Sequence, residues 1–359
     1  MTGTRAPSFH VDPGYTHRDV RRGRLIALRV HTRSFAINVV LIVFAAISAV
    51  LAISLGEYPL SPQQVAQALL GHGDELHRTI VLEWRLPIAI AAVAFGALLG
   101  IGGAIFQSLT RNPLGSPDVI GFDAGAFTAV VVTVLLLGSG GYWQIAGASI
   151  LGGLLTAFLV YALAYRRGVQ GFRLIIVGIA ISAALGSINA YLITRADIHE
   201  AMSVGFWGAG SLARVSWSSL APSLVLGAVI LCAAGLLAPA LRQLELGDDA
   251  ALAQGVEAGR ARLGLLVVGV ATSALVTAAA GPIGFIALAA PQLARRLTRT
   301  PGVSVVSAGC MGAALLTAAH LLSLGIAQFY RPVPVGLLTV CLGGLYLIWL
   351  LIRETRKAA

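Results

Sequence analysis

Ten apolar segments recur along this chain of 359 residues, and they constrain its fold more than any other feature. A helix needs about 20 predominantly apolar residues to cross the hydrocarbon core of a bilayer. Only 11% of the residues are charged, against roughly 25% in soluble domains, so too few charges remain to cover a soluble surface. The sequence therefore predicts an all-α, polytopic membrane protein with about ten transmembrane helices. The segments are approximately 34–55, 88–109, 118–137, 143–165, 172–193, 219–238, 263–280, 282–297, 303–326 and 334–352.

The basic residues between these segments indicate the orientation. If the N-terminus is cytoplasmic, 20 of the 25 Lys and Arg residues fall on the cytoplasmic side, which is the side where such an excess is usual. We therefore predict cytoplasmic N- and C-termini. The chain divides into a basic arm (1–33), expected to be disordered or to lie on the membrane surface, a transmembrane domain (34–352) and a tail (353–359). Ten crossings also divide into inverted halves of five, an arrangement common in transporters.

Two regions interrupt the apolar pattern. A polar turn that contains Pro113 and Pro117 follows the segment 88–109. The segment 282–297 is short and contains two prolines, which predicts a helix that is broken or partly re-entrant. Non-helical backbone at membrane depth is tolerated only where protein or a cavity covers it.

The sequence also excludes several functions. Its single lysine, Lys357, lies near the C-terminus, so the chain contains no nucleotide-binding loop of the G-x-x-x-x-G-K-[ST] type. If ATP drives transport, the ATPase is therefore another polypeptide. The arginines flank apolar segments instead of covering one soluble face, which argues against nucleic acid as a partner. The three cysteines have no CxxC spacing, and we expect no metal site, no catalytic residue and no cofactor in this chain.

A secondary transporter and a membrane-embedded enzyme are the alternative classes. Coupled carriers usually need ionisable residues at membrane depth, and the apolar segments contain almost none. An enzyme would need a cluster of His, Asp or Glu at that depth. His320 is the candidate inside a segment, and a lone histidine there is more often a packed polar residue. Both alternatives are therefore disfavoured.

Five blocks of sequence, in order, resemble the permease subunits of ATP-binding-cassette (ABC) importers for ferric siderophores, haem and vitamin B12. The first block runs from Arg85-Leu-Pro87, through a Gly/Ala-rich segment, to Gln107-x-x-x-Arg111-Asn-Pro-Leu114. The others are Trp207-Gly-Ala-Gly-Ser211, the loop from Leu246 to Val256, Gly281-Pro-Ile-Gly-Phe285 followed by Pro291-Gln-Leu-Ala-Arg295, and Pro334-Val-Gly336. The resemblance covers about residues 34–352, and five ordered blocks are more specific than any single one.

The resemblance implies a permease subunit that imports a ferric siderophore across the bacterial inner membrane. Haem or a corrinoid is the alternative cargo. It also implies partners: two cytoplasmic ATP-binding subunits, an extracytoplasmic substrate-binding protein such as a lipoprotein, and a second permease chain, all assembled in membrane lipid. ATP hydrolysis would then occur on the partner chains.

The resemblance further implies roles for three groups of residues. Asn112, Pro113 and Leu114 correspond to a cytoplasmic gate, and Arg85 and Arg331 to outer arginines that dock the binding protein. Asp248 or Asp249 is also expected to cap a short helix in the loop that couples the permease to the ATPase. This coupling loop comprises Leu246, Gly247, Asp248, Ala250, Ala251, Leu252, Gly255 and Val256.

Four positions depart from the family pattern. Ile88 stands in place of a second outer arginine, and Gln292 in place of a usual histidine. Pro332 replaces an acidic residue, and Leu345 replaces a proline. These departures indicate a divergent subfamily in which a sister permease chain supplies missing contacts, and they favour a heterodimer over a homodimer.

Overall fold

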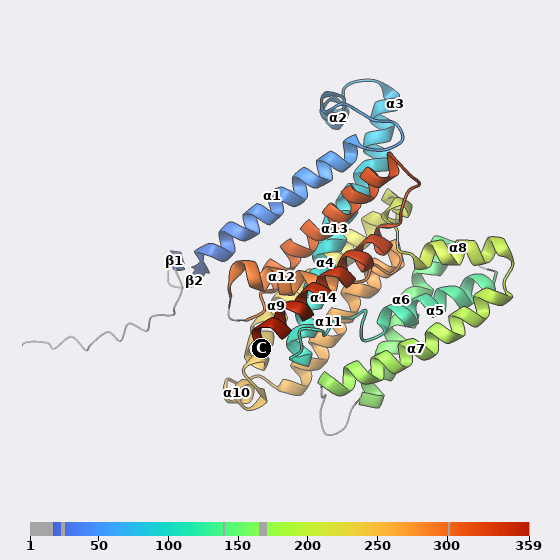
Figure 1. Cartoon of the computed structure of the whole chain (residues 1–359). Helices are drawn as coiled ribbons and strands as arrows, with labels where there is room; N and C mark the ends of the chain where they lie inside the picture. The colour runs from blue at the N-terminus through green and yellow to red at the C-terminus, as the bar shows by residue number, and fades with distance from the viewer. Residues whose placement is uncertain (1–16, 23–25, 139–140, 165–170, 301, 359) are drawn as a thin grey trace, which may run out of the picture.

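The computed structural model describes residues 17–22, 26–138, 141–164, 171–300 and 302–358 of the chain (Figure 1). Its first half contains β1 (His17–Arg22), β2 (Ile26–His31), α1 (Thr32–Ser54), α2 (Pro62–Leu69), α3 (Glu75–Arg78), a π-helical turn η1 (Thr79–Arg85), α4 (Leu86–Thr110), α5 (Phe122–Leu135), α6 (Tyr142–Ala164) and α7 (Gly171–Arg195). The rest contains α8 (Ile198–Gly208), a 3₁₀ turn η2 (Leu212–Arg214), α9 (Trp217–Glu245), α10 (Asp248–Ala253), α11 (Ala258–Ala280), α12 (Ile286–Thr298), α13 (Val305–Ala327) and α14 (Val335–Ala358).

Each of the ten predicted apolar segments contains one helix. Within the described residues, seven helical stretches are long and apolar enough to cross a membrane: α1, the continuous run Glu75–Thr110, α6, α7, α9, α11 and α13. Two shorter apolar helices are α5 and the first part of α14. The 13 residues of α12 rise only about 20 Å, less than the thickness of a bilayer core. This helix is continuous from Ile286 to Thr298 in spite of Pro291, so the segment is short, as predicted, and the helix itself is not broken.

Helix α4 lies at the centre of the bundle. It packs against α1, α9, α11, α12 and α13, and most of its side chains are buried (Figure 1). Helices α1, α7 and α9 instead expose most of their apolar surface, as helices that face lipid do. Close packing at the centre depends on glycine, because a Cβ atom on Gly96 or Gly100 would collide with the backbone of α13 at Gly312 and Ala308.

The ends of the bundle are clearly separated. The start of α1, the short helix α10 and the end of α14 lie at one end, while α2 and α3 lie at the other (Figure 1). At the α2 end, Ser61 caps α2: the Gln64 amide donates to Ser61 Oγ at 3.3 Å, and the Ser61 amide donates to Gln64 Oε1 at 2.8 Å. We refer below to the α10 end as the inner end and to the α2 end as the outer end.

Two terminal regions differ from the prediction. The described part of the basic arm contains two antiparallel strands, β1 and β2, in which His17 pairs with His31. Alternation of apolar and polar residues from Ile26 to His31 has the period of a strand, which explains β2. Residues 1–16 lie outside the described part. At the other end, α14 continues to Ala358, so the predicted tail extends a helix instead of leaving it.

Candidate gate and coupling site

The end of α4 forms the turn that the sequence assigns to a gate. Arg111 ends the helix in the left-handed conformation, with a φ angle of 48°, and Pro113 cannot continue it. The Leu114 amide donates to Asn112 Oδ1 at 2.9 Å, which folds the three predicted gate residues into a local turn. The sequence predicted the position of this turn correctly, because Pro113 disfavours helical geometry both at its own position and at Asn112.

This turn is attached to the short helix α12. Gln292 Nε2 donates to the Pro113 carbonyl at 2.5 Å, and Gln107 Nε2 donates to the Leu288 carbonyl at 2.9 Å. A Cβ on Gly103 would collide with the backbone of Ala287, so α4 and α12 are also in close backbone contact. Gln292, which departs from the family pattern, therefore holds the gate turn against α12.

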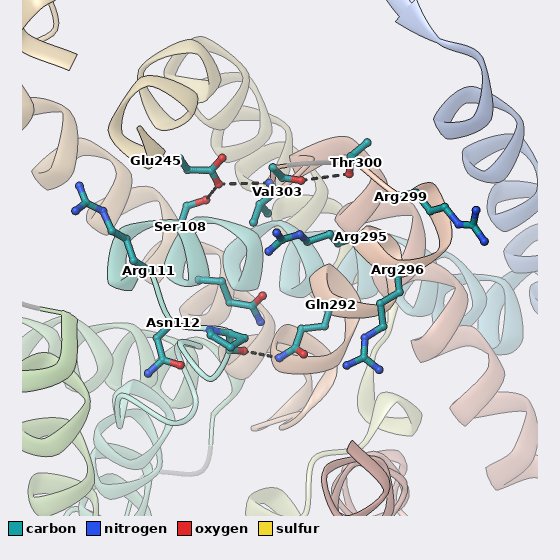
Figure 2. Close-up of a pocket in the computed structure, with 13 residues that line it drawn as sticks. Ser108, Arg111, Asn112, Glu245, Gln292, Arg295, Arg296, Arg299, Thr300 and Val303 are labelled. Carbon is teal, nitrogen blue, oxygen red and sulfur yellow. Dashed lines mark hydrogen bonds between the residues drawn. The ribbon is translucent and has the colours of Figure 1, made fainter. Parts of the chain in front are cut away.

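A cavity of about 690 Å³ opens beside the turn at the inner end (Figure 2). Asn112 and Pro113 line it, whereas Leu114 lies outside the lining and is half exposed. The lining also includes Gln107, Ser108, Arg111, Glu245, Gln292, Arg295, Arg296, Arg299, Thr300, Gly302 and Val303. Four of these residues are arginines and one is a carboxylate, so the mouth of the cavity carries a net positive charge.

The end of α9 and the start of α10 contact the end of α4. Glu245 accepts hydrogen bonds from Ser108 Oγ and, at 3.4 Å, from the Val303 amide (Figure 2). Asp248 Oδ1 lies 3.0 Å from Arg111 Nη2 and 2.5 Å from Arg262 Nη2. The structure therefore brings the predicted coupling loop into contact with Arg111, the residue before the predicted gate turn, a juxtaposition that sequence spacing does not reveal.

The coupling loop itself contains the short helix α10. The expectation that Asp248 or Asp249 caps this helix is wrong: Gly247 occupies the cap position with a φ angle of 120°, and both acids lie in the first turn. Ala251 is fully buried, whereas Leu252 is 58% exposed and Leu246 is 72% exposed. The remaining predicted residues, Ala250, Gly255 and Val256, lie on or beside α10 and are at least partly accessible.

The two predicted docking arginines have different environments at the outer end. Arg85 donates to the Ile53 carbonyl at 2.8 Å and to the Tyr58 carbonyl at 2.7 Å, so its guanidinium closes the loop between α1 and α2. Arg331 is exposed in the loop between α13 and α14. This loop lies beside the first one, because Gln328 Nε2 donates to the Gly56 carbonyl at 3.3 Å. Geometry thus favours a structural role for Arg85 and leaves Arg331 accessible.

The outer end also contains features that the sequence reasoning missed. Phe329 and Tyr330, which precede Arg331, are almost fully exposed. A second cavity of about 310 Å³ lies under the α1–α2 loop, and its lining includes Arg85, Ile88 and the buried His320. Ile88, which stands in place of the family's second arginine, thus helps to form an apolar wall.

Three of the sequence blocks meet inside the bundle, at a junction that no single motif predicts. The Ser211 amide donates to the Ala280 carbonyl at 2.7 Å, and the Gly336 amide donates to the Gly210 carbonyl at 2.9 Å. Beside them, the Phe285 amide donates to Asp118 Oδ2 at 2.9 Å. The glycines in these blocks were the sequence signal for this junction. Gly210 and Gly281 both have positive φ angles, which glycine adopts readily.

Carboxylates also lie among the membrane helices, so the expectation that these segments contain almost no acid needs correction. Asp123, in the first turn of α5, accepts hydrogen bonds from Ser273 Oγ at 2.8 Å and from Thr277 Oγ1 at 3.1 Å, both on α11. Asp123 therefore joins α5 to α11 through hydrogen bonds, just as Asp118 joins its turn to Phe285 at the junction.

We predict that Asp118→Ala destabilises the protein and that Asp118→Asn does not. Alanine leaves the Phe285 amide without an acceptor inside the bundle, at a cost of about 1–3 kcal/mol. Asparagine retains a carbonyl oxygen at the position of Oδ2, and the Oδ1 atom of Asp118 has no hydrogen-bond partner among the described residues. Thermal unfolding of the purified protein in detergent measures both effects. Equal stability of the alanine variant and the wild type would show that the junction does not need this bond.

Comparison with known proteins agrees with this geometry. Residues 42–353 match the model of the FecCD transport family. The ferric enterobactin transport system permease protein FepG of Escherichia coli K12 is 44% identical over 327 residues, which are 91% of this chain and 98% of FepG. The hemin transport system permease protein HmuU of Yersinia pestis is 35% identical over 77% of this chain and 84% of its own length.

A solved structure shows the same fold. A metal-chelate type ABC transporter in an inward-facing conformation superposes with a TM-score of 0.75 at 24% identity, over 89% of this chain and 99% of that one. The protein is thus a helical, polytopic membrane protein. Because the family model and FepG each match most of its length, the chain belongs to the FecCD transport family.

Proposed function

We propose that this chain is the permease subunit of an ABC importer that moves a ferric siderophore into the cytoplasm. The observation that carries the proposal is the 44% identity to a ferric enterobactin permease over nearly the whole of both chains. Haem is the second candidate cargo, and the lower identity of 35% to a hemin permease makes it the weaker one.

Family membership implies ATPase and binding-protein partners in general. We propose two cytoplasmic ATPase subunits at the inner end, an extracytoplasmic binding protein at the outer end and a second permease chain. The exposed residues Leu246 and Leu252 offer an apolar contact for an ATPase. The absence of a second outer arginine at Ile88 favours a heterodimer, in which the sister chain supplies further docking charges.

We further propose ten crossings in two inverted halves, with both termini cytoplasmic. The pair α4–α5 supports this arrangement because it resembles the pair α11–α12. In each pair a long, largely buried helix leads through an irregular joint to a helix of 14 or 13 residues. Each short helix begins after a left-handed residue, Gly121 or Phe285. Broken helices at equivalent places in the two halves are typical of transporters with inverted repeats.

The proposed mechanism follows from this arrangement. ATP-driven closure of the partner subunits displaces α10, and the contacts of Glu245 and Asp248 pass that displacement to the end of α4. The gate turn then moves relative to α12, which opens or closes the inner cavity. All the chemistry of ATP hydrolysis remains on the partner chains, and this chain supplies the pathway.

Deleting the gene in its host tests the proposed cargo. The deletion strain should lose uptake of radiolabelled ferric enterobactin, and a plasmid copy of the gene should restore it. Haem uptake in the same strain is the matched control and should remain unchanged. Normal siderophore uptake together with lost haem uptake would replace the first cargo with the second.

We predict that Leu252→Asp weakens attachment of the ATPase, because it places a charge on an exposed apolar contact. Loss of an apolar anchor at the centre of an interface costs about 2 kcal/mol or more, which is roughly a thirtyfold change in affinity. Co-purification of the ATPase with the permease measures the effect. Arg260→Ala, an exposed change just beyond the loop, is the control. Ala251→Asp should instead lower the stability of the permease, since Ala251 is buried. Undiminished co-purification of Leu252→Asp would refute the coupling-loop assignment.

We predict that Arg331→Glu slows docking of the binding protein, and that the effect is larger at low ionic strength because salt screens exposed charges. Arg85→Gln, by contrast, should lower the stability of the outer loop, because it weakens the hydrogen bonds to the Ile53 and Tyr58 carbonyls. Surface plasmon resonance at two salt concentrations measures the first effect, and thermal unfolding measures the second. An affinity that is unaffected by Arg331→Glu at both concentrations would exclude this arginine from docking.

A further inference from the structure

We infer that Asp248 is a positioning residue that makes the gate turn move together with α10. This inference deepens the proposed function and rests on it. It concerns the segment Leu244-Glu245-Leu246-Gly247-Asp248, which we call the elbow and which joins the end of α9 to the start of α10. The elbow joins the coupling loop on one side to the end of α4 on the other.

The first contact of the elbow is with Arg111. The Nη2 atom of this arginine donates to the Leu244 carbonyl at 3.1 Å and to Asp248 Oδ1 at 3.0 Å. Arg111 is the last residue before the predicted gate turn, and its left-handed conformation sets the direction in which the chain leaves α4. A displacement of Asp248 therefore acts directly on the residue that orients Asn112.

The second contact fixes the same helix end at another point. Ser108 donates to Glu245, and Ser108 lies three residues before Arg111, on the same face of the last turn of α4. Glu245 also accepts from the Val303 amide, in the connection between α12 and α13. Two attachment points on one helical turn restrain rotation as well as translation, so α4 follows the elbow as a rigid element.

Asp248 also holds α11. Arg262, near the start of α11, contacts the same Oδ1 atom at 2.5 Å, and its side chain is only 20% exposed. Helices α4 and α11 are the two that lead into the irregular joints of the bundle, at 112–121 and 281–285. One carboxylate thus connects α10 to both helices that end at a joint.

The ion pair between Arg111 and Asp248 is of a kind that can be removed without unfolding the protein. The side chains of Arg111 and Asp248 are about half exposed, and ion pairs of that kind add little to stability. Replacing Asp248 is therefore expected to leave the helical bundle folded while removing the connection. The chain offers matched controls: Asp249, which forms no ion pair within the described residues, and the exposed pair Glu257–Arg260 at 2.9 Å.

The test uses the complete transporter, with both permease chains, the ATPases and the binding protein, in liposomes. For Asp248→Ala, which removes the Oδ1 atom that both arginines contact, we expect the ATPase to co-purify and the amount of ferric enterobactin imported per ATP hydrolysed to fall by roughly tenfold. Arg111→Gln should do the same, and the double variant should lose no more than either single variant. Asp249→Ala and Glu257→Ala should keep the wild-type ratio.

A second measurement reports on the gate without reference to cargo. In a background with Cys232, Cys310 and Cys341 replaced by serine, a maleimide labels Leu114→Cys, which is half exposed. ATP should change the labelling rate in this background, and Asp248→Ala should abolish the change. If the wild-type complex shows the ATP response but imports no ferric enterobactin, the proposed cargo is wrong and the inference stands.

Two results would overturn the inference. One is an unchanged import ratio and an unchanged ATP response in Asp248→Ala. The other is loss of ATPase co-purification in Asp248→Ala, because Asp248 would then belong to the contact with the ATPase instead of positioning α4.

Discussion

Hydrocarbon offers no hydrogen-bond partner to a backbone amide or carbonyl group. The bundle therefore depends on how the peptide groups between its interrupted helices find partners inside the protein. The joints at 112–121 and 281–285 both leave helical geometry within the protein. Their polar groups pair with one another and with glycine-containing segments, as the Phe285 amide does with Asp118 and the Ser211 amide with the Ala280 carbonyl. Segments far apart in sequence must therefore assemble before any joint is stable, which makes the centre of the protein a cooperative unit.

The middle and the inner end of α4 are held by different forces. Its middle packs against α13 at glycine contacts with no space for a methyl group, so the two helices cannot separate slightly without losing the contact. Its inner end is held by hydrogen bonds and half-exposed ion pairs from Glu245, Asp248 and Gln292. Polar contacts of this kind can exchange partners at low cost, so the structure concentrates its capacity for movement at the inner end.

Hydropathy and length were enough to predict the long helices, since each apolar segment contains one, but they did not predict α3 or α8 between the segments. They were not enough where distant contacts decide the outcome. Helix α5 begins at Phe122 and not at 118, because Asp118 is engaged by Phe285, 167 positions away. Ala251 appears in sequence as part of an alanine-rich exposed surface, yet it is buried under α9 and α11. Arg85 matches a docking motif, but nearby carbonyl groups bind its guanidinium. In each of these three cases the residue was identified from the sequence, but its contact partner in the folded protein could not be predicted from the sequence.

The amide of Gln292 has a further consequence for the turn it holds. An imidazole at this position would gain or lose a proton between about pH 5 and pH 8, and its hydrogen bond to a carbonyl would strengthen or weaken with it. A carboxamide does not titrate, so the bond from Gln292 Nε2 to the Pro113 carbonyl is the same at acidic as at neutral pH. The glutamine makes this contact insensitive to proton concentration, and in the proposed mechanism movement of α10 is then the main influence left on it.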